Sequence, residues 1–160
     1  MTCFYTLRGR NNILIFRHFK ILMNMATVEK FEDLICWKKS REFANHIFDI
    51  TDKSLFRDYD LKRQLRRAAV SPMSNIAEGF GRGTRAEFVD ALYIARGEVS
   101  EARSQLYIAF DRTYLSRQDF EKGLSLSDEC SRLIQSFSKK VKGNIHRGTQ
   151  FKALTPYQNV

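Results

Sequence analysis

The chain has 160 residues, of which 43% are hydrophobic and 28% are charged. This balance is typical of one globular domain and excludes a largely disordered chain. Lys and Arg outnumber Asp and Glu by 27 to 18, which gives a net charge of +9. Most of the excess lies at the ends, since residues 1–26 carry +4, residues 144–160 carry +2, and residues 27–143 carry only +3. Charge alone is therefore a weak indication of what the central region binds.

Three regions are expected along the chain. Residues 1–26 are interpreted as an N-terminal extension outside the domain, either a disordered leader or residues before the true start at Met23 or Met25. The intact mass of the natively expressed protein would distinguish the two. The apolar run in this region is too short to cross a membrane and lacks the cleavage pattern of a secretory signal. Residues 27–143 form the expected domain, and residues 144–160 lose its periodicity, which predicts a flexible tail.

The central region predicts an all-α protein, because its apolar residues recur at steps of three and four. Four helices are expected, at about 29–52, 59–80, 85–112 and 117–141. Pro72 is expected to bend the second helix, and the spacing of Ser116 to Asp119 predicts a capping box for the fourth. Short loops between helices of this length favour an antiparallel up-down-up-down four-helix bundle.

The joint between the second and third helices is rich in glycine. Gly79, Gly81 and Gly83 are expected to interrupt the second helix, because glycine adopts the positive φ that helix ends require. Thr84 and Glu87 then have the spacing of a capping box for the third helix. A phosphate-binding P-loop would need a preceding strand and a Gly-Lys-Ser/Thr ending, and the sequence has neither here. A helix joint is the preferred interpretation.

Small residues suggest close helix contacts. Ala95, Ala102 and Ala109 are seven residues apart, so one seam of the third helix is small over three heptads and allows another helix to approach closely. That helix belongs either to the same bundle, which is favoured, or to another subunit. Glu78 is expected to act in a cap, a salt bridge or an interface. The candidate positions for helix packing or oligomer contact are Glu78, Gly79, Ala95, Gly97, Ala102 and Ala109.

Basic residues form a stripe on the second helix, on the side opposite Leu61 and Leu65. Arg82 and Arg85 flank a helix N-terminus that could hold an anion, and Arg96 and Arg103 are expected to form another exposed pair. Two interpretations stay open, a solvated face with salt bridges or a salt-sensitive contact with phosphates. The candidate nucleic-acid-binding residues are Lys62, Arg63, Arg66, Arg67, Arg82 and Arg85.

No arrangement of side chains predicts an enzyme, a cofactor or a metal site. The serines near the glycine joint lack a plausible base. The odd number of cysteines, Cys3, Cys36 and Cys130, has no Cys-x-x-Cys pair, and the three histidines show no ligand spacing. Unpaired thiols in a reducing cytoplasm are the expected state.

The run Ser74-Asn75-Ile76-Ala77-Glu78-Gly79-Phe80-Gly81-Arg82 resembles the signature of a family, together with Glu87-Phe88, Ile94-Ala95, Gly97, Glu101 and Gln105-Leu106. These are small four-helix-bundle proteins that are often encoded in intervening sequences of bacterial 23S rRNA genes, and they are similar to the accessory variability determinant of diversity-generating retroelements. The resemblance covers roughly residues 28–142. It implies a homo-oligomer, with a pentamer as the expected form.

Two functions are expected from the residues and the resemblance together. The first is a non-enzymatic, basic, oligomeric protein that binds structured RNA or RNA–DNA through its helix surfaces. The second is a protein-interaction scaffold without nucleic-acid contact, whose partner would be a protein such as a reverse transcriptase or a ribosome-associated factor. Neither function involves a membrane.

Overall fold

The computed structural model describes residues 28–143, so the expected N-terminal extension, the start at Met23 or Met25, and the expected tail lie outside the described residues. Within this range the chain is all-α and has no strand, which confirms the predicted fold class and the number of long helices. The elements are a short 3-10 helix η2 (Phe31–Asp33) and the α-helices α2 (Ile35–Thr51), α3 (Tyr59–Gly81), α4 (Arg85–Asp111) and α5 (Arg117–Gly143).

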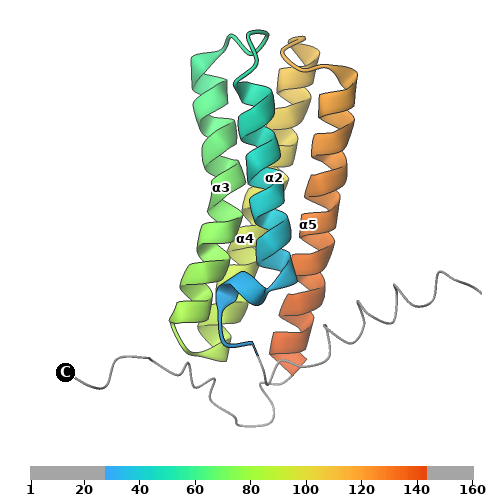
Figure 1. Ribbon diagram of the computed structural model, residues 1–160. Helices are drawn as coiled ribbons and strands as arrows, with labels where there is room; N and C mark the ends of the chain where they lie inside the picture. The colour runs from blue at the N-terminus through green and yellow to red at the C-terminus, as the bar shows by residue number, and fades with distance from the viewer. Residues whose placement is uncertain (1–27, 144–160) are drawn as a thin grey trace, which may run out of the picture.

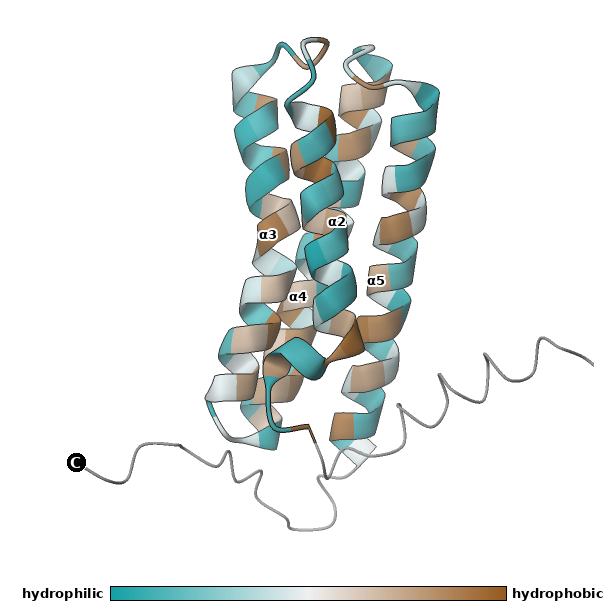
Figure 2. Ribbon diagram, viewed as in Figure 1, coloured by the Kyte–Doolittle hydropathy of each residue, from teal (hydrophilic) through white to brown (hydrophobic). Residues whose placement is uncertain are grey.

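The four α-helices form a bundle in which neighbours along the chain are also neighbours in space (Figure 1). Both α2 and α4 pack against α3 and α5, so α2 and α4 occupy opposite corners. The loops after α2 and α4 lie at one end of the bundle, and the loop after α3 lies at the other (Figure 1). The side of α2 that faces the viewer is largely hydrophilic (Figure 2), as expected for a helix with one face in water.

The core consists of the predicted apolar faces. Phe43, Leu65, Leu92, Leu106 and Ile134 are completely buried and come from all four α-helices. Burial of a side chain of this size contributes roughly 1.5–3 kcal/mol. The apolar periodicity therefore stabilises the bundle by removing one stripe of every helix from water.

The first helix is shorter than the expected 29–52. Leu34 has an extended backbone, with φ −67° and ψ 124°, and it separates η2 from α2. The side chain of Leu34 is buried, and the ring of Phe31 packs edge-on against Trp37 with 5.2 Å between centroids. The break turns the chain inward, so that these apolar side chains cover the end of the core. A straight helix from residue 29 would not place them there.

The glycine joint differs from the prediction at two of its three glycines, because Gly79 and Gly81 both belong to α3. Gly79 does not interrupt the second helix but lies buried inside α3, which continues through Pro72 to Gly81. A Cβ atom at Gly79 would lie 2.4 Å from the Cβ of Ala91 and 3.1 Å from the Phe88 ring. Of the three glycines, only Gly83 has a positive φ, at 78°. Gly79 therefore permits close contact between α3 and α4, while Gly83 makes the turn.

Thr84 and Ser116 both cap their helices as predicted, each by accepting a hydrogen bond from a backbone N–H. The backbone N–H of Glu87 donates to the Thr84 hydroxyl over 3.3 Å, and that hydroxyl donates to the Glu87 carboxylate over 2.5 Å. At the start of α5, the backbone N–H of Asp119 donates to the Ser116 hydroxyl over 3.1 Å. The two bonds from the backbone N–H groups satisfy donors that have no partner within their own helix, so they set where α4 and α5 begin.

Candidate nucleic-acid interface

Two of the four cations in the predicted stripe face α2. Arg66 donates to the Asp52 carboxylate over 2.5 Å and to the Thr51 hydroxyl over 2.7 Å, and its guanidinium lies 4.6 Å from the centre of the Phe48 ring. Lys62 donates to the same carboxylate over 3.1 Å. The hydrogen bonds from Arg66 and Lys62 hold the pKa of Asp52 below its usual value. These two cations join α2 to α3, and their charge is largely offset by the Asp52 carboxylate.

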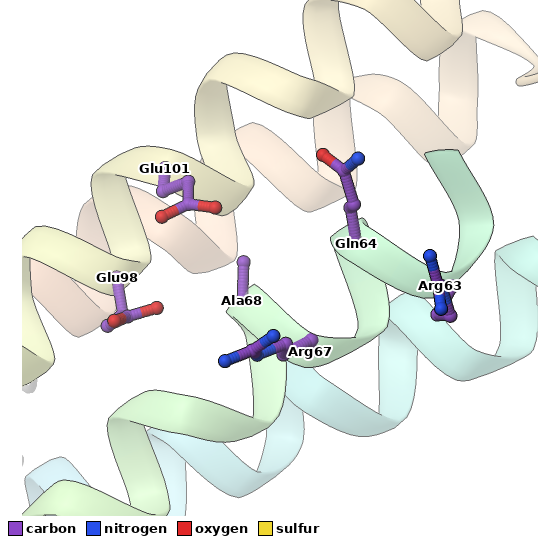
Figure 3. Close-up of a pocket in the computed structure, with 6 residues that line it drawn as sticks. All are labelled: Arg63, Gln64, Arg67, Ala68, Glu98 and Glu101. Carbon is purple, nitrogen blue, oxygen red and sulfur yellow. The ribbon is translucent and has the colours of Figure 1, made fainter. Parts of the chain in front are cut away.

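The other two cations of the stripe face a groove between α3 and α4. Arg63 and Arg67 line a pocket of about 480 Å³, and Glu98 and Glu101 of α4 stand on its opposite side (Figure 3). Arg63 pairs with Asp60 over 3.6 Å at the surface, a type of pair that contributes little to stability. In the described part of the chain, Arg67 takes part in no ion pair. The stripe is thus divided between two surfaces, and Arg63 and Arg67 are its more exposed half.

The basic residues at the glycine joint lie at the far end of the bundle from the α2–α3 loop. Arg82 donates to the Glu78 carboxylate over 2.5 Å and lies 4.0 Å from the Glu87 carboxylate. Of the roles expected for Glu78, a salt bridge is the one that it has within the chain. Arg85 is half-buried at the start of α4. Acidic neighbours therefore offset the charge of Arg82 at this helix end.

Arg96 and Arg103 do not form the exposed pair that their spacing predicts. Both are only partly exposed. Arg103 donates to the Asp128 carboxylate and to the Ser127 hydroxyl, so it joins α4 to α5. A seven-residue spacing places two side chains on one face of a helix, but the position of α5 determines whether that face meets solvent.

The small residues of α4 divide between its two sides. Ala95, Ala102 and Ala109 are completely buried, so they pack within the bundle and are not available to another subunit. Gly97 is exposed, and a Cβ atom placed there would meet nothing within 4 Å. Gly97 therefore makes no close helix contact within the described residues, because it lies on the outer face of α4. A contact of Gly97 with another subunit stays a prediction.

A second basic stripe, on α5, is absent from the sequence-based candidates. Arg132, Lys139 and Lys142 are exposed and share one face, because their spacing of seven and three residues follows the helical repeat. No ion pair engages any of the three within residues 28–143. A signal in the sequence could have found this α5 stripe. All 18 Asp and Glu residues lie between Glu29 and Glu129 with 17 Lys and Arg, whereas residues 130–160 hold six Lys and Arg and no acid.

The described thiols are buried and free. Burial raises the pKa of Cys36 and of Cys130 to about 12, which keeps both thiols protonated at neutral pH. No group of three or more His, Cys, Asp and Glu side chains in residues 28–143 could hold a metal ion. None of the described helices contains an apolar stretch that could span a lipid bilayer.

The fold and its surface define a small helical-bundle protein with charged outer faces. The sequence model of the 23S rRNA-intervening sequence protein family matches residues 32–136, and the chain belongs to this family. A crystal structure of a protein of unknown function from the S23 ribosomal protein family of Bacteroides thetaiotaomicron is similar, with 27% identity and a TM-score of 0.61. The match covers 66% of this chain and 96% of that one. A comparison with curated proteins found no match.

Proposed function

We propose that this protein is a non-enzymatic, cytoplasmic, self-associating bundle that binds structured RNA or RNA–DNA through sequence-independent contacts with phosphates. The family name refers to intervening sequences of 23S rRNA, which makes a structured ribosomal RNA fragment the first ligand to test. The observation that carries the proposal is the α5 stripe, because its three exposed cations have no acidic partner in the described chain.

Charge compensation explains why the α5 stripe is favoured over the whole set of predicted cations. An Asp or Glu near a cation weakens the potential that attracts a phosphate, since the two charges largely cancel at a distance. Asp52, Glu78 and Asp60 do this for Arg66, Arg82 and Arg63. The α5 stripe is the stronger candidate. Arg67 faces Glu98 and Glu101 across the groove, so Lys62, Arg63, Arg66, Arg67, Arg82 and Arg85 contribute less.

Self-association would increase the affinity of such a modest surface. Three cations per copy give a weak, salt-sensitive contact, but several copies in one assembly repeat the contact along a single RNA. We propose an antiparallel up-down-up-down bundle that assembles as a homo-oligomer, with five copies as the number that the family resemblance implies.

A protein-interaction scaffold is the second candidate function. Four large apolar side chains on the outer side of α4 are exposed, which favours contact with another protein surface: Tyr93, Ile94, Tyr107 and Ile108. The partner in this case would be a reverse transcriptase or a ribosome-associated factor, and the charged residues would serve solubility alone.

The decisive experiment measures RNA affinity as a function of salt. The protein is purified with nuclease treatment, and its binding to a structured RNA fragment is followed by fluorescence anisotropy between low and physiological salt. Neutralising the α5 stripe with Arg132→Gln, Lys139→Gln and Lys142→Gln should weaken binding at least tenfold. The magnitude of the slope of log K against log salt should fall by about 2–3 per copy. Each phosphate contact that is lost means about one counterion fewer released on binding.

A matched control lies on the same helix. Arg117 and Lys122 are exposed near the start of α5, and Arg117→Gln with Lys122→Gln removes two charges without touching the α5 stripe. This variant should retain most of the affinity. A defined oligomer with no salt-dependent RNA binding would reject the proposal and favour the scaffold.

A further inference from the structure

The outer side of α4 carries apolar residues that the bundle does not cover. Ile94 and Ile108 are 54% and 53% exposed, and the adjacent Tyr93 and Tyr107 are 45% and 44% exposed. The two pairs are fourteen residues apart, so they lie on the same side of the helix. The opposite side of α4 is already buried in the core through residues such as Leu92 and Leu106. α4 is therefore apolar on both sides, which is typical of a helix that packs against two different surfaces.

The groove beside this face separates charges of opposite sign. Arg63 and Arg67 of α3 line one wall, and Glu98 and Glu101 of α4 line the other (Figure 3). No ion pair within the described residues joins the two walls. Glu101 lies midway between Ile94 and Ile108 at seven-residue steps, so the acidic wall and the apolar face are continuous.

We infer that a second copy of this chain covers the outer face of α4, with α3 of one copy packed against α4 of the other. Arg63 and Arg67 of one copy then oppose Glu98 and Glu101 of the next, because all four residues lie at one height along the same groove. Ile94 and Ile108 pack on either side of these charges. The inference rests on the proposed self-association and names the surface that produces it.

Charge complementarity favours a second copy over an unrelated protein as the occupant. The surface contains both signs of charge side by side, so its own copy is a ready complement once α3 and α4 face each other. A dimer forms when both walls of one copy contact the same neighbour. A ring forms when each wall contacts a different neighbour.

The apolar part of the contact is tested by two substitutions that leave the net charge unchanged. Ile94→Gln with Ile108→Gln should reduce the mass measured by light scattering from a multiple of 18.7 kDa to that of the single chain. Leu55→Gln is the control, because Leu55 is 47% exposed but lies in the α2–α3 loop. The control should retain the wild-type mass, and circular dichroism should show unchanged helicity in both variants.

The charged part is tested by reversal and restoration. Arg63→Glu with Arg67→Glu should weaken self-association at least tenfold in sedimentation equilibrium, and so should Glu98→Arg with Glu101→Arg. The chain that carries all four reversals should associate again, because the opposed charges are exchanged but still complementary. Failure of the fourfold variant to associate, in a chain that remains helical, would overturn the proposed opposition of charges.

The outcome separates this inference from the proposed function. A wild-type oligomer that survives Ile94→Gln with Ile108→Gln would overturn this interface and leave the proposed assembly and RNA binding intact. A wild-type protein that is monomeric at all concentrations would overturn both the assembly and this interface. RNA binding through the α5 stripe is tested separately, by comparing the salt dependence of the wild type with that of the Arg132→Gln, Lys139→Gln and Lys142→Gln variant.

Discussion

At the scale of single residues, His46 links two helices through one buried nitrogen. The His46 side chain is buried, and its Nε2 atom lies 3.0 Å from the backbone carbonyl oxygen of Asp119. Because a carbonyl oxygen only accepts, Nε2 carries the proton and donates it. Burial lowers the pKa of His46, since the imidazolium form would lose its hydration. The neutral ring therefore belongs to the folded state.

This lowered pKa predicts that stability declines in mild acid. The unfolded chain takes up a proton near pH 6.5, whereas the folded His46 resists it, so this stabilisation is complete above pH 6.5 and is lost as pH falls toward the folded pKa. Lys122 disfavours the protonated ring, and Asp49 and Asp119 favour it. Denaturant unfolding at pH 7 and pH 5 should show a smaller loss for His46→Gln than for the wild type. Equal losses would show that His46 does not couple to folding.

The Asp119 carboxylate, which lies near His46, does not titrate in the pH range of this comparison. Burial alone would raise the pKa of Asp119, but hydrogen bonds from Lys53 and the Ser116 hydroxyl lower it below the usual value. The carboxylate thus stays ionised between pH 7 and pH 5. The comparison of the two proteins reports on the imidazole.

At the scale of elements, the contact of α3 with α4 depends on a glycine inside a helix. A glycine in a helix interior costs about 0.5–1 kcal/mol relative to alanine, so its presence needs a reason. At Gly79 the reason is steric, because the Ala91 side chain and the Phe88 ring occupy the space that a Cβ atom would need. Phe88 in turn packs edge-on against Phe80 and Phe137, which connects α3, α4 and α5 at this end of the bundle.

The close approach predicts that Gly79→Ala is destabilising. Its added methyl group must displace α3 or α4, and overpacking of this kind costs about 1–3 kcal/mol of unfolding free energy. Gly81→Ala is the matched control, since a Cβ atom there meets nothing within 4 Å. The control should be neutral or slightly stabilising in chemical denaturation. Equal effects of the two substitutions would contradict the steric explanation.

At the scale of the whole molecule, charge is distributed unevenly along the chain. The interval from Glu29 to Glu129 has a net charge of −1, and the excess of positive charge lies outside it. Most of the bundle is therefore nearly neutral, and its excess of positive charge lies on α5. In an assembly, the α5 stripes of several copies would form a repeated basic surface, and affinity would grow with the number of copies.

This arrangement predicts that RNA affinity depends on assembly. Ile94→Gln with Ile108→Gln leaves every cation in place, yet the dissociated chain should bind a long structured RNA at least tenfold more weakly, because avidity is lost. The slope of log K against log salt should also be smaller, since fewer phosphates are contacted at once. Anisotropy over a salt series measures both quantities. Unchanged affinity in a chain shown to be monomeric would mean that each copy binds RNA independently.

Much of the fold follows from local patterns in the sequence. The three-and-four spacing of apolar residues predicts the helices, and Thr84 and Ser116 predict where α4 and α5 begin, because a cap depends on residues within one turn. The same local rules fail at Leu34 and Gly79. The backbone of Leu34 is extended, which buries its side chain in the core. Gly79 stays helical, and its missing side chain lets α4 approach. In both cases the cause is packing against other elements, which local patterns do not contain.

The amino-acid sequence by itself determined the all-α class, the four helices and the family. The tertiary structure decided which cations are available, because an ion pair depends on how two helices are rotated about their axes. Lys62 and Arg66 face Asp52, Arg103 faces Asp128, and the outer side of α4 remains uncovered. Helical periodicity places side chains on a face, but only the packing of the neighbouring helix determines what that face meets.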